Sequence, residues 1–421
     1  MQEETKKTVV LLGVNTKEIE HIVYSMEELK GLAFAANYDV KKSFIQKVEH
    51  SHFASYVGSG KLLEIGMYVK EQYIDVVICN DELSPLQIRK MEEVLDCELL
   101  DRTLLILHIF AERAKTKEAM LQIELARLQY LLPRLIGSQE LDRQGGGNGG
   151  FKNRGAGETK LELDKRRIEA QIQKQKKALK QLVEDRQVAR QKRKKRGKKI
   201  VALVGYTNAG KSTLMNQFLK KSHNEKEVYV KDMLFATLET KTRKIVLPHK
   251  HTIILTDTVG FVDKLPHALI NAFRSTLEEV KEADILLHVI DYSNPFYEAQ
   301  MRTTQSVLQA LGASHLPIFN VFNKLDKISN VDPYTKNDSV FLSARKGQGI
   351  SLLLEVMEKK LFGEIEILYA MIPYTKEKLL HQIHEHYEVV EENASVEGVH
   401  IAFYATMEER KLFETYIDKD H

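Results

Sequence analysis

The hydrophobic pattern of the first 112 residues alternates between strand-like and helix-like segments. Short apolar runs predict buried strands, and apolar residues at helical spacing predict amphipathic helices. Strands are predicted at residues 8–14 and 74–78, and helices at residues 17–36 and 84–95. The second helix has Ser84 as its expected N-cap. Residues 58–61 (GSGK) lack the spacing of a phosphate-binding loop, so we expect a plain turn there. The alternation predicts an N-terminal α/β domain over residues 1–112.

Residues 113–196 contain two longer apolar stripes at helical spacing. The stripes consist of Leu121, Leu125, Leu128 and Leu132, and of Ile168, Ile172, Leu179 and Leu182. Two stripes of similar length joined by a loop predict an antiparallel helical hairpin. The loop is expected at residues 138–158, which hold seven glycines between Gly145 and Gly157. A glycine-rich loop of this length suggests either a functional segment or a simple connector.

Residues 197–362 alternate apolar strand-like runs with helical segments, and residues 363–421 form a smaller unit. For that unit we predict a helix at 375–391 and strands at 365–372 and 400–404. His381, His384 and His386 are expected on a polar face of the helix rather than in a metal site, because no acidic partner has the usual spacing. The fold class is therefore a multidomain α/β protein: an N-terminal α/β unit with a helical hairpin, a mostly parallel sheet covered by helices on both faces, and a small C-terminal α+β domain.

The apolar run at residues 199–204 leads directly into GYTNAGKS, residues 205–212. The spacing G-x-x-x-x-G-K-S between a strand and a helix is typical of a P-loop, whose backbone N–H groups surround phosphates. Lys211 is the expected cation for the β- and γ-phosphates, and Ser212 is an expected ligand of Mg²⁺. The P-loop residues expected to contact the nucleotide are Gly205, Tyr206, Thr207, Asn208, Ala209, Gly210, Lys211, Ser212 and Thr213.

A second strand-like run, residues 252–256, ends in the sequence DTVG. Asp257 can hold a Mg²⁺-bound water and Gly260 can present its N–H to the γ-phosphate, so with Lys211 they are the expected catalytic residues. The residues expected to contact GTP from this loop are Asp257, Thr258, Val259 and Gly260. The upstream segment expected to contact GTP is Phe235, Ala236, Thr237, Leu238 and Glu239. Its threonine can bind Mg²⁺, although Thr240 and Thr242 are alternatives by spacing.

The sequence NKLD follows the strand-like run 318–322, and SAR follows the run 340–342. A carboxylate at Asp326 can accept two hydrogen bonds from guanine, which adenine cannot donate. Lys324 can lie along the base, and Asn323 can join this loop to the P-loop. The residues expected to contact guanine are Asn323, Lys324, Leu325, Asp326, Ser343, Ala344 and Arg345. Four motifs in this order, each at the end of a strand, predict a Mg²⁺-dependent GTPase. The alternative of a P-loop kinase is disfavoured, because the NKLD and SAR motifs have no role in such an enzyme.

The composition argues against a disulfide-rich, secreted or membrane protein. The chain has 421 residues, of which 43% are hydrophobic, so it can bury several cores. It has only two cysteines, Cys79 and Cys97, which excludes a disulfide framework. Neither a membrane-spanning apolar run nor a signal-peptide pattern is present, so we expect a cytoplasmic protein.

Positive charge is concentrated between residues 158 and 199, which hold 17 Lys or Arg against 6 Asp or Glu. Such a block is either a solvated linker or a contact for a polyanion. The candidate RNA-binding residues are Arg143, Lys152 and Arg154 in the glycine-rich loop and Lys192, Arg193, Lys194, Lys195 and Arg196 in the basic run.

Longer segments resemble HflX-type GTPases of the translation-factor-related class. The similar segments are residues 101–114 (DRTLLILHIFAERA), 154–162 (RGAGETKLE), 235–238 (FATL), 257–279 (DTVGFVDKLPHALINAFRSTLEE) and 283–295 (ADILLHVIDYSNP). The resemblance covers nearly the whole chain in the same domain order, and it favours Thr237 over Thr240 as the Mg²⁺ threonine. The domains expected from the pattern along the chain are residues 1–112, 113–196, 197–362 and 363–421.

The resemblance implies a bacterial GTPase that binds the large (50S) ribosomal subunit and splits stalled or idle 70S ribosomes under stress. It implies that the N-terminal unit and the hairpin bind ribosomal RNA, with the glycine-rich loop directed at the peptidyl-transferase centre. We expect the free protein to be a monomer. Departures at His108, Ala156, Lys160 and residues 239–241 leave open a paralogue acting in antibiotic resistance. Hydrolysis of ATP also stays open, as does a GTP-gated module that assembles subunits without splitting ribosomes.

Overall fold

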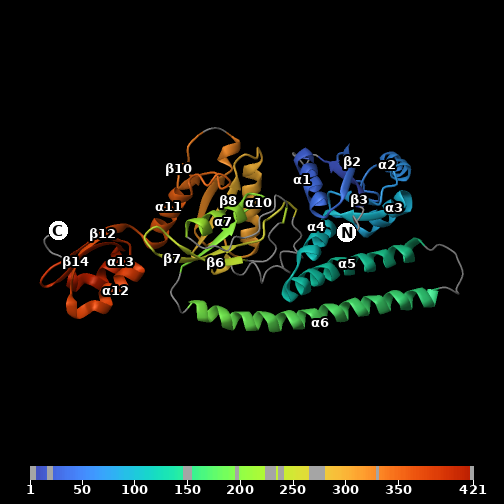
Figure 1. Ribbon diagram of the computed structural model, residues 1–421. Helices are drawn as coiled ribbons and strands as arrows, with labels where there is room; N and C mark the ends of the chain where they lie inside the picture. The colour runs from blue at the N-terminus through green and yellow to red at the C-terminus, as the bar shows by residue number, and fades with distance from the viewer. Residues whose placement is uncertain are drawn as a thin grey trace. The chain divides into compact units, whose positions relative to one another are not determined.

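The computed structural model describes residues 6–16, 22–145, 154–194, 199–222, 234–235, 241–264, 280–328 and 331–417. Within the long helices, only the backbone is described for residues 136–145, 154–161 and 183–194. The chain divides into two compact units. Unit 1 contains residues 1–191, 232–239 and 262–276, and unit 2 contains residues 192–231, 240–261 and 277–421. The fold is the predicted multidomain α/β class (Figure 1).

Unit 1 begins with a four-stranded parallel sheet in the order β2-β1-β3-β4. Its strands are β1 (Thr8–Asn15), β2 (Asp39–Lys47), β3 (Val76–Cys79) and β4 (Glu98–Asp101). Its helices are α1 (Ile22–Ala35), α2 (Ser59–Glu71), α3 (Pro85–Leu95) and α4 (Arg102–Arg113). The N-cap prediction is confirmed, because Ser84 accepts a hydrogen bond from the Gln87 backbone in a capping box. The turn predicted at residues 58–61 is wrong: Ser59 to Lys61 form the first turn of α2, and Gly58 is its N-cap.

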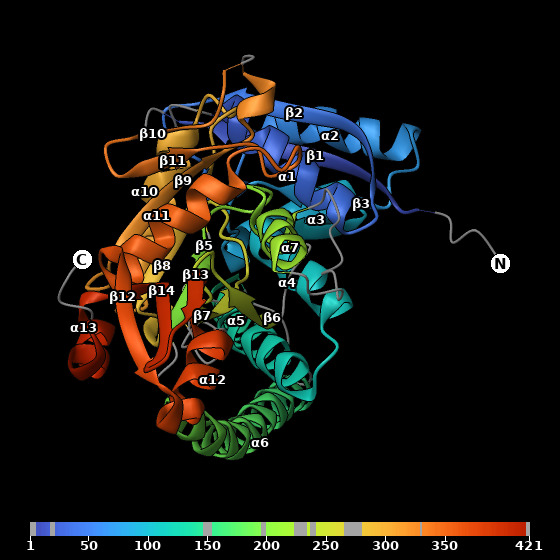
Figure 2. The same cartoon turned by 60° about the vertical axis from the view of Figure 1, so that its left-hand side comes forward.

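The predicted helical hairpin consists of α5 (Lys117–Gly145) and α6 (Arg154–Lys194). The two helices run side by side in both views (Figures 1 and 2). Their predicted stripes meet, since Leu125, Leu128 and Ile172 are buried together with Leu132, Ile168 and Leu179 against them. The loop prediction is too long at both ends: α5 continues through Pro133 to Gly145, and α6 already begins at Arg154. Residues 146–153 lie outside the described part of the chain.

Unit 2 is built on a seven-stranded sheet in the order β10-β11-β9-β8-β5-β7-β6. Its strands are β5 (Lys199–Val204), β6 (Lys241–Val246), β7 (Thr252–Asp257), β8 (Ile285–Asp291), β9 (Ile318–Asn323), β10 (Tyr334–Lys336) and β11 (Ser339–Phe341). Its helices are α7 (Lys211–Lys221), α10 (Tyr297–Ala310) and α11 (Ile350–Phe362). The five inner strands are mutually parallel, and β6 and β10 are antiparallel at the two edges.

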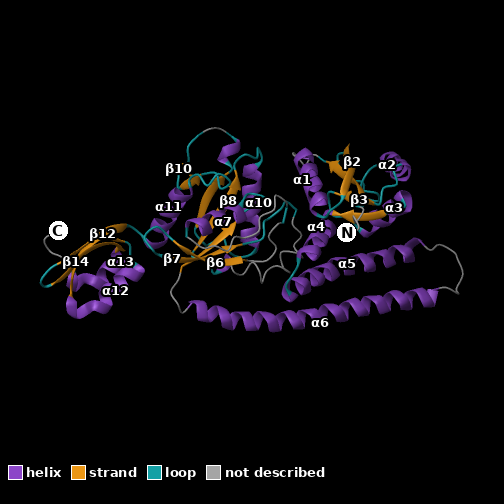
Figure 3. Cartoon of the chain, viewed as in Figure 1, coloured by secondary structure: helices purple, strands orange, loops and turns teal. Residues whose placement is uncertain are grey.

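The C-terminal part of unit 2 is a three-stranded antiparallel sheet with helices gathered on one side (Figure 3). It contains β12 (Ile365–Pro373), α12 (Glu377–His386), β13 (Val389–Ala394), β14 (Gly398–Thr406) and α13 (Met407–Arg410). The predicted helix 375–391 is wrong beyond residue 386. Tyr387 is extended, and the β-branched pair Val389 and Val390 begins β13. His384 forms an ion pair with Glu392 of that strand, at 3.1 Å.

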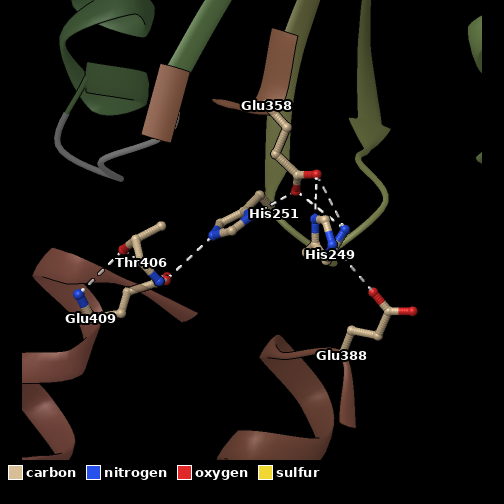
Figure 4. A network of polar contacts seen from close by, with 6 residues as sticks. All are labelled: His249, His251, Glu358, Glu388, Thr406 and Glu409. Carbon is tan, nitrogen blue, oxygen red and sulfur yellow. Dashed lines mark hydrogen bonds and ion pairs between the residues drawn. The ribbon is translucent and has the colours of Figure 1, made fainter. Parts of the chain in front are cut away.

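A network of histidines and carboxylates joins the turn between β6 and β7 to α11 and to the C-terminal sheet (Figure 4). The Glu358 carboxylate, which is fully buried, lies 2.8 Å from His249 Nδ1 and 2.7 Å from His251 Nδ1. His251 Nε2 lies 3.4 Å from Glu409, and His249 Nε2 lies 4.0 Å from Glu388. We call these five residues the histidine junction. It holds the tip of the β6–β7 hairpin, whose other end carries Asp257.

Among the described helices, none has the length and apolar character needed to cross a membrane.

Candidate nucleotide site

The predicted motif residues gather because β11, β9, β8, β5 and β7 are neighbouring parallel strands. The carboxyl ends of parallel strands lie at one edge of a sheet, where open α/β folds bind ligands. The P-loop follows β5, the DTVG loop follows β7, and the NKLD and SAR loops follow β9 and β11. Four segments spread over some 140 residues of sequence therefore reach one edge.

The P-loop needs its glycines for both conformation and space. Gly205 and Gly210 have φ values of +141° and +100°, which L-residues rarely adopt. A Cβ atom on Gly205 would lie 2.2 Å from the Val289 carbonyl oxygen, and one on Gly210 would lie 2.2 Å from Asn323 Nδ2. Asn208 also has a left-handed conformation, with φ of 59°. The strained loop ends where α7 begins, so its N–H groups and the helix N-terminus face the same edge.

Lys211 is buried within this loop. Its Nζ donates hydrogen bonds to the carbonyl oxygens of Gly205, at 2.9 Å, and Tyr206, at 2.7 Å. Burial lowers the pKa of Lys211 to about 8, and Asp257 opposes that shift. An ammonium that has lost its water and faces neutral carbonyls gains free energy when a phosphate replaces them.

Ser212 and Asp257 bring two oxygen ligands together. Ser212 Oγ donates to Asp257 Oδ2 at 2.7 Å, and Asp257 is fully buried at the end of β7. A hydroxyl and a carboxylate are the hard oxygen donors that Mg²⁺ accepts, usually with waters and phosphate oxygens. The donor set therefore fits the predicted magnesium site.

The DTVG loop packs directly on the P-loop. Thr207 N donates to the Phe261 carbonyl at 2.7 Å, and Phe261 N donates to the Gly205 carbonyl at 3.1 Å. A Cβ atom on Gly260 would lie 2.7 Å from Thr207 Cα and 2.9 Å from Lys211 Nζ. Only glycine fits at residue 260, where the two loops touch beside the lysine ammonium.

The NKLD and SAR loops are joined to each other and to the P-loop by one side chain. Asn323 Nδ2 donates to the Ala209 carbonyl at 2.8 Å, and its Oδ1 accepts from Ala344 N at 2.9 Å. The expected link between Asn323 and the P-loop is thus confirmed. Asp326 Oδ1 accepts from Ser343 Oγ at 2.5 Å, which orients the carboxylate.

Lys324 has a partner that the sequence reasoning missed. Its Nζ lies 2.8 Å from Asp291 Oδ2, and its backbone is left-handed with φ of 67°. Asp291 ends β8, which lies between β9 and β5, the strands that lead into the NKLD loop and the P-loop. Its position as a carboxylate at the end of a parallel strand was the signal that could have identified it.

Several predicted site residues lie outside this arrangement. Phe235 is described, but it belongs to unit 1. Seven further predicted residues lie outside the described part of the chain: Ala236, Thr237, Leu238, Glu239, Lys152, Lys195 and Arg196. Arg143 lies in α5, and Arg154, Lys192, Arg193 and Lys194 lie in α6, where only the backbone is described.

Three family models match consecutive parts of the chain. They are described as GTP-binding GTPase N-terminal (residues 23–111), GTP-binding GTPase Middle Region (residues 113–193) and 50S ribosome-binding GTPase (residues 200–324). Together they match most of the N-terminal α/β region, the hairpin, and the part of the seven-stranded sheet that runs from β5 to β9.

Curated relatives match over almost the full length. A GTPase HflX of Caldanaerobacter subterraneus subsp. tengcongensis is 43% identical over 98% of this chain and 94% of its own. A GTPase HflX of Lacrimispora saccharolytica is 38% identical over 99% of this chain and 96% of its own. A solved GTP-binding protein of Sulfolobus solfataricus, in complex with GDP, is 26% identical and aligns to 84% of this chain and 98% of its own, with a TM-score of 0.44. The chain is a GTPase and belongs to the HflX family.

Proposed function

We propose that the strand-end loops bind GTP with Mg²⁺ through the residues predicted from the motifs. The bridge made by Asn323 between the P-loop and the SAR loop is the observation that carries this proposal, because it joins the phosphate-side and base-side loops in one network. Lys211 exchanges two carbonyl partners for the β- and γ-phosphates. Ser212 and Thr237 hold Mg²⁺, and Asp257 holds one of its waters; the ion would neutralise charge that develops on the phosphates.

Base selection is assigned to Asp326 and Lys324. The Asp326 carboxylate is oriented by Ser343, which leaves its second oxygen and its remaining lone pairs for guanine N1–H and N2–H₂. Lys324 is fixed by Asp291, so its aliphatic stem can lie along the base. Gly260 presents its N–H to the γ-phosphate, and its position against Thr207 and Lys211 supports that role.

For the partner we propose the large ribosomal subunit, with splitting of 70S ribosomes in the cytoplasm as the outcome. The match of residues 200–324 to the 50S ribosome-binding GTPase family and the positive charge of residues 158–199 support this proposal. In this scheme Lys192 to Arg196 supply affinity for ribosomal RNA. The glycine-rich segment, with Arg143, Lys152 and Arg154, makes the contact that separates the subunits.

Sucrose-gradient profiles of 70S ribosomes test this proposal. The full chain is mixed with ribosomes and GTP, GDP or a non-hydrolysable GTP analogue. We expect free subunits to accumulate with GTP or the analogue and not with GDP. Ribosomes that stay intact under all three conditions, with the protein bound, would contradict splitting and favour the alternative, a binding module for subunit assembly.

Two variants separate affinity from splitting. Replacing residues 192–196 by Ala should weaken subunit binding and flatten its salt dependence, because fewer counterions are released. Replacing residues 144–157 by a short Gly-Ser link should preserve GTP hydrolysis and some cosedimentation but abolish splitting. Hydrolysis is the folding control, since β5 begins some forty residues later in the sequence. If the shortened protein splits ribosomes as well as the parent does, the loop is only a connector.

A further inference from the structure

Helix α4 and the residue before it account for most of the segment 101–114, which carries the family resemblance but has no assigned role. This helix belongs to unit 1, together with residues 232–239 and 262–276. The first of these segments contains the proposed ligand Thr237, and the second begins shortly after the proposed ligand Gly260 in the sequence. Contacts of α4 with their described residues, 234–235 and 262–264, therefore bear on nucleotide binding.

Arg102, at the start of α4, holds the chain that leaves the DTVG loop. Its side chain is 2% exposed and pairs with Glu28, and its Nη1 donates to Asn80 Oδ1 at 3.0 Å. The third nitrogen, Nε, donates to the Asp263 carbonyl oxygen at 3.3 Å. Because Glu28 and Asn80 hold the guanidinium in place, the direction of its Nε–H is fixed. The Asp263 carbonyl therefore accepts from a donor that is already oriented.

Arg113, at the end of α4, holds the chain that leads to Thr237. Its Nη1 donates to the Leu234 carbonyl at 2.5 Å, and its Nη2 donates to the Ala35 carbonyl of α1 at 3.2 Å. One turn earlier in α4, Phe110 packs edge-to-face on Phe235, with ring centroids 4.5 Å apart. Phe235 is 2% exposed and has a left-handed backbone, so its conformation depends on this packing.

The same helix is joined to the hairpin through its N-cap, Asp101. The Asp101 carboxylate accepts from Leu104 N at 2.9 Å and from the Tyr130 hydroxyl of α5 at 2.6 Å. Arg134 of α5 pairs with the same carboxylate and stacks on the Tyr130 ring. Helix α4 is thus tied to α5 by part-buried, charge-assisted hydrogen bonds.

We infer that Arg113 and Arg102 are positioning residues for the segments 232–239 and 262–276, respectively, and that α4 connects the position of those segments to the hairpin helix α5. A segment anchored at one end loses less conformational entropy when the γ-phosphate orders it. GDP has no γ-phosphate, so its affinity should not depend on the contacts of Arg102 and Arg113 with these segments. The inference rests on the proposed roles of Thr237 and Gly260 in the nucleotide site.

Arg113→Ala tests the positioning role, because this arginine, unlike Arg102, has no buried carboxylate that its loss would leave unpaired. We expect calorimetry of the full chain to show affinity for a β,γ-imido GTP analogue lowered by about 5- to 30-fold, the cost of ordering one more residue. Affinity for GDP should stay unchanged. Arg113→Lys should restore part of the GTP preference, since an ammonium can still reach one carbonyl. The matched control is Arg89→Ala, an exposed arginine paired with Glu93 on its own helix.

Hydrogen exchange of residues 117–135 tests the connection to α5. We expect the parent to show different exchange with GDP and with the GTP analogue, and Tyr130→Phe to lose that difference while keeping the GTP preference. Equal losses of GDP and GTP-analogue affinity in Arg113→Ala would mean that the arginine is only structural, and no nucleotide-dependent exchange in the parent would remove the connection. A parent that binds neither nucleotide would instead contradict the proposed nucleotide site.

Discussion

The strand-end loops of the nucleotide site and the histidine junction both belong to unit 2, and both depend on buried polar groups, but they are encoded differently. The nucleotide site is assembled from short runs of adjacent residues, each at the end of a strand, such as residues 205–212 and 323–326. In the junction, His251 contacts Glu358 and Glu409, which lie 107 and 158 residues away. A local motif can be identified from its spacing, whereas a set of single distant residues has no spacing to identify.

The two regions also differ in what supplies the polar groups. In the nucleotide site the glycines Gly205, Gly210 and Gly260 bring backbone atoms close together, and a Cβ at any of them would clash. In the junction both histidine rings contact carboxylates from other elements, and the backbone contributes one donor, the His249 N–H, to Glu358. A site built from backbone atoms restricts which residue can stand at each position, so it leaves a strong pattern in the sequence. A network of side chains restricts only which two residues can pair, and those residues are far apart in the sequence. The comparison predicts that changes in the two regions have separable effects.

The largest expected effect is on base selection. Asp326→Asn should lower GTP affinity by about 2–4 kcal/mol, because guanine then faces an amide that cannot accept from both N–H groups. Affinity for xanthosine triphosphate should rise, since the amide can donate to its extra carbonyl oxygen. Calorimetry with both nucleotides measures this, with the exposed Asp332→Asn as the control. Unchanged GTP binding would remove Asp326 from the site. It would also contradict the claim that the nucleotide site can be identified from its local motifs.

The histidine junction should affect stability and leave nucleotide affinity unchanged. His251→Ala removes the partner shared by Glu358 and Glu409 and should lower the free energy of unfolding by about 1–3 kcal/mol, the cost of unpaired buried polar groups. Chemical denaturation measures this, with His315→Ala as a control at an exposed histidine. GDP affinity should stay at the parent value. A large loss of GDP affinity would show that the junction and the nucleotide site act as one region.

Sequence reasoning identified the fold class and the strand-end motifs, because periodicity and spacing are local properties. It was wrong where local signals compete: residues 387–391 continue a helical pattern, yet Val389 and Glu391 pair with β14 and a register shift lies between them. Residues 138–145 looked like loop because glycines follow them, although they extend α5. The roles of Arg102 and Arg113 could not be predicted at all. Their partners at residues 234 and 263 lie more than 100 residues away in the sequence, and no spacing within α4 indicates them.

A smaller effect is expected from pH, through the charge on His251. Burial lowers the pKa of His251, but hydrogen bonds to Glu358 and Glu409 outweigh it and raise the pKa to about 9. The folded pKa lies above the unfolded value of 6.5, so this stabilisation is complete below pH 6.5 and is lost as pH rises through 9. Thermal melting from pH 6 to 9.5 should show the parent losing stability relative to His251→Ala. Parallel curves would mean that His251 is neutral in the junction.

The smallest expected effect is a preference between monovalent cations, which tests how far the nucleotide site can be understood from its motifs. Phe261 stands where many small GTPases carry a water-orienting glutamine, and a phenyl ring cannot polarise water. Asn208 is exposed in the P-loop with a left-handed backbone, so its amide oxygen is available to a cation beside the phosphates. We therefore expect slow intrinsic turnover, severalfold faster with K⁺ than with Na⁺, and further stimulated by the large ribosomal subunit.

Phosphate release in matched KCl and NaCl solutions measures this preference, and Asn208→Ala should abolish it without changing GDP affinity. The alanine variant also has to adopt a left-handed backbone at this position, so Asn208→Gly serves as the control that removes the amide without strain. If both variants keep the preference for K⁺, the amide is not a ligand. Fast turnover without ribosomes and without a cation preference would show that another group activates the water, one that the motifs of the site do not contain.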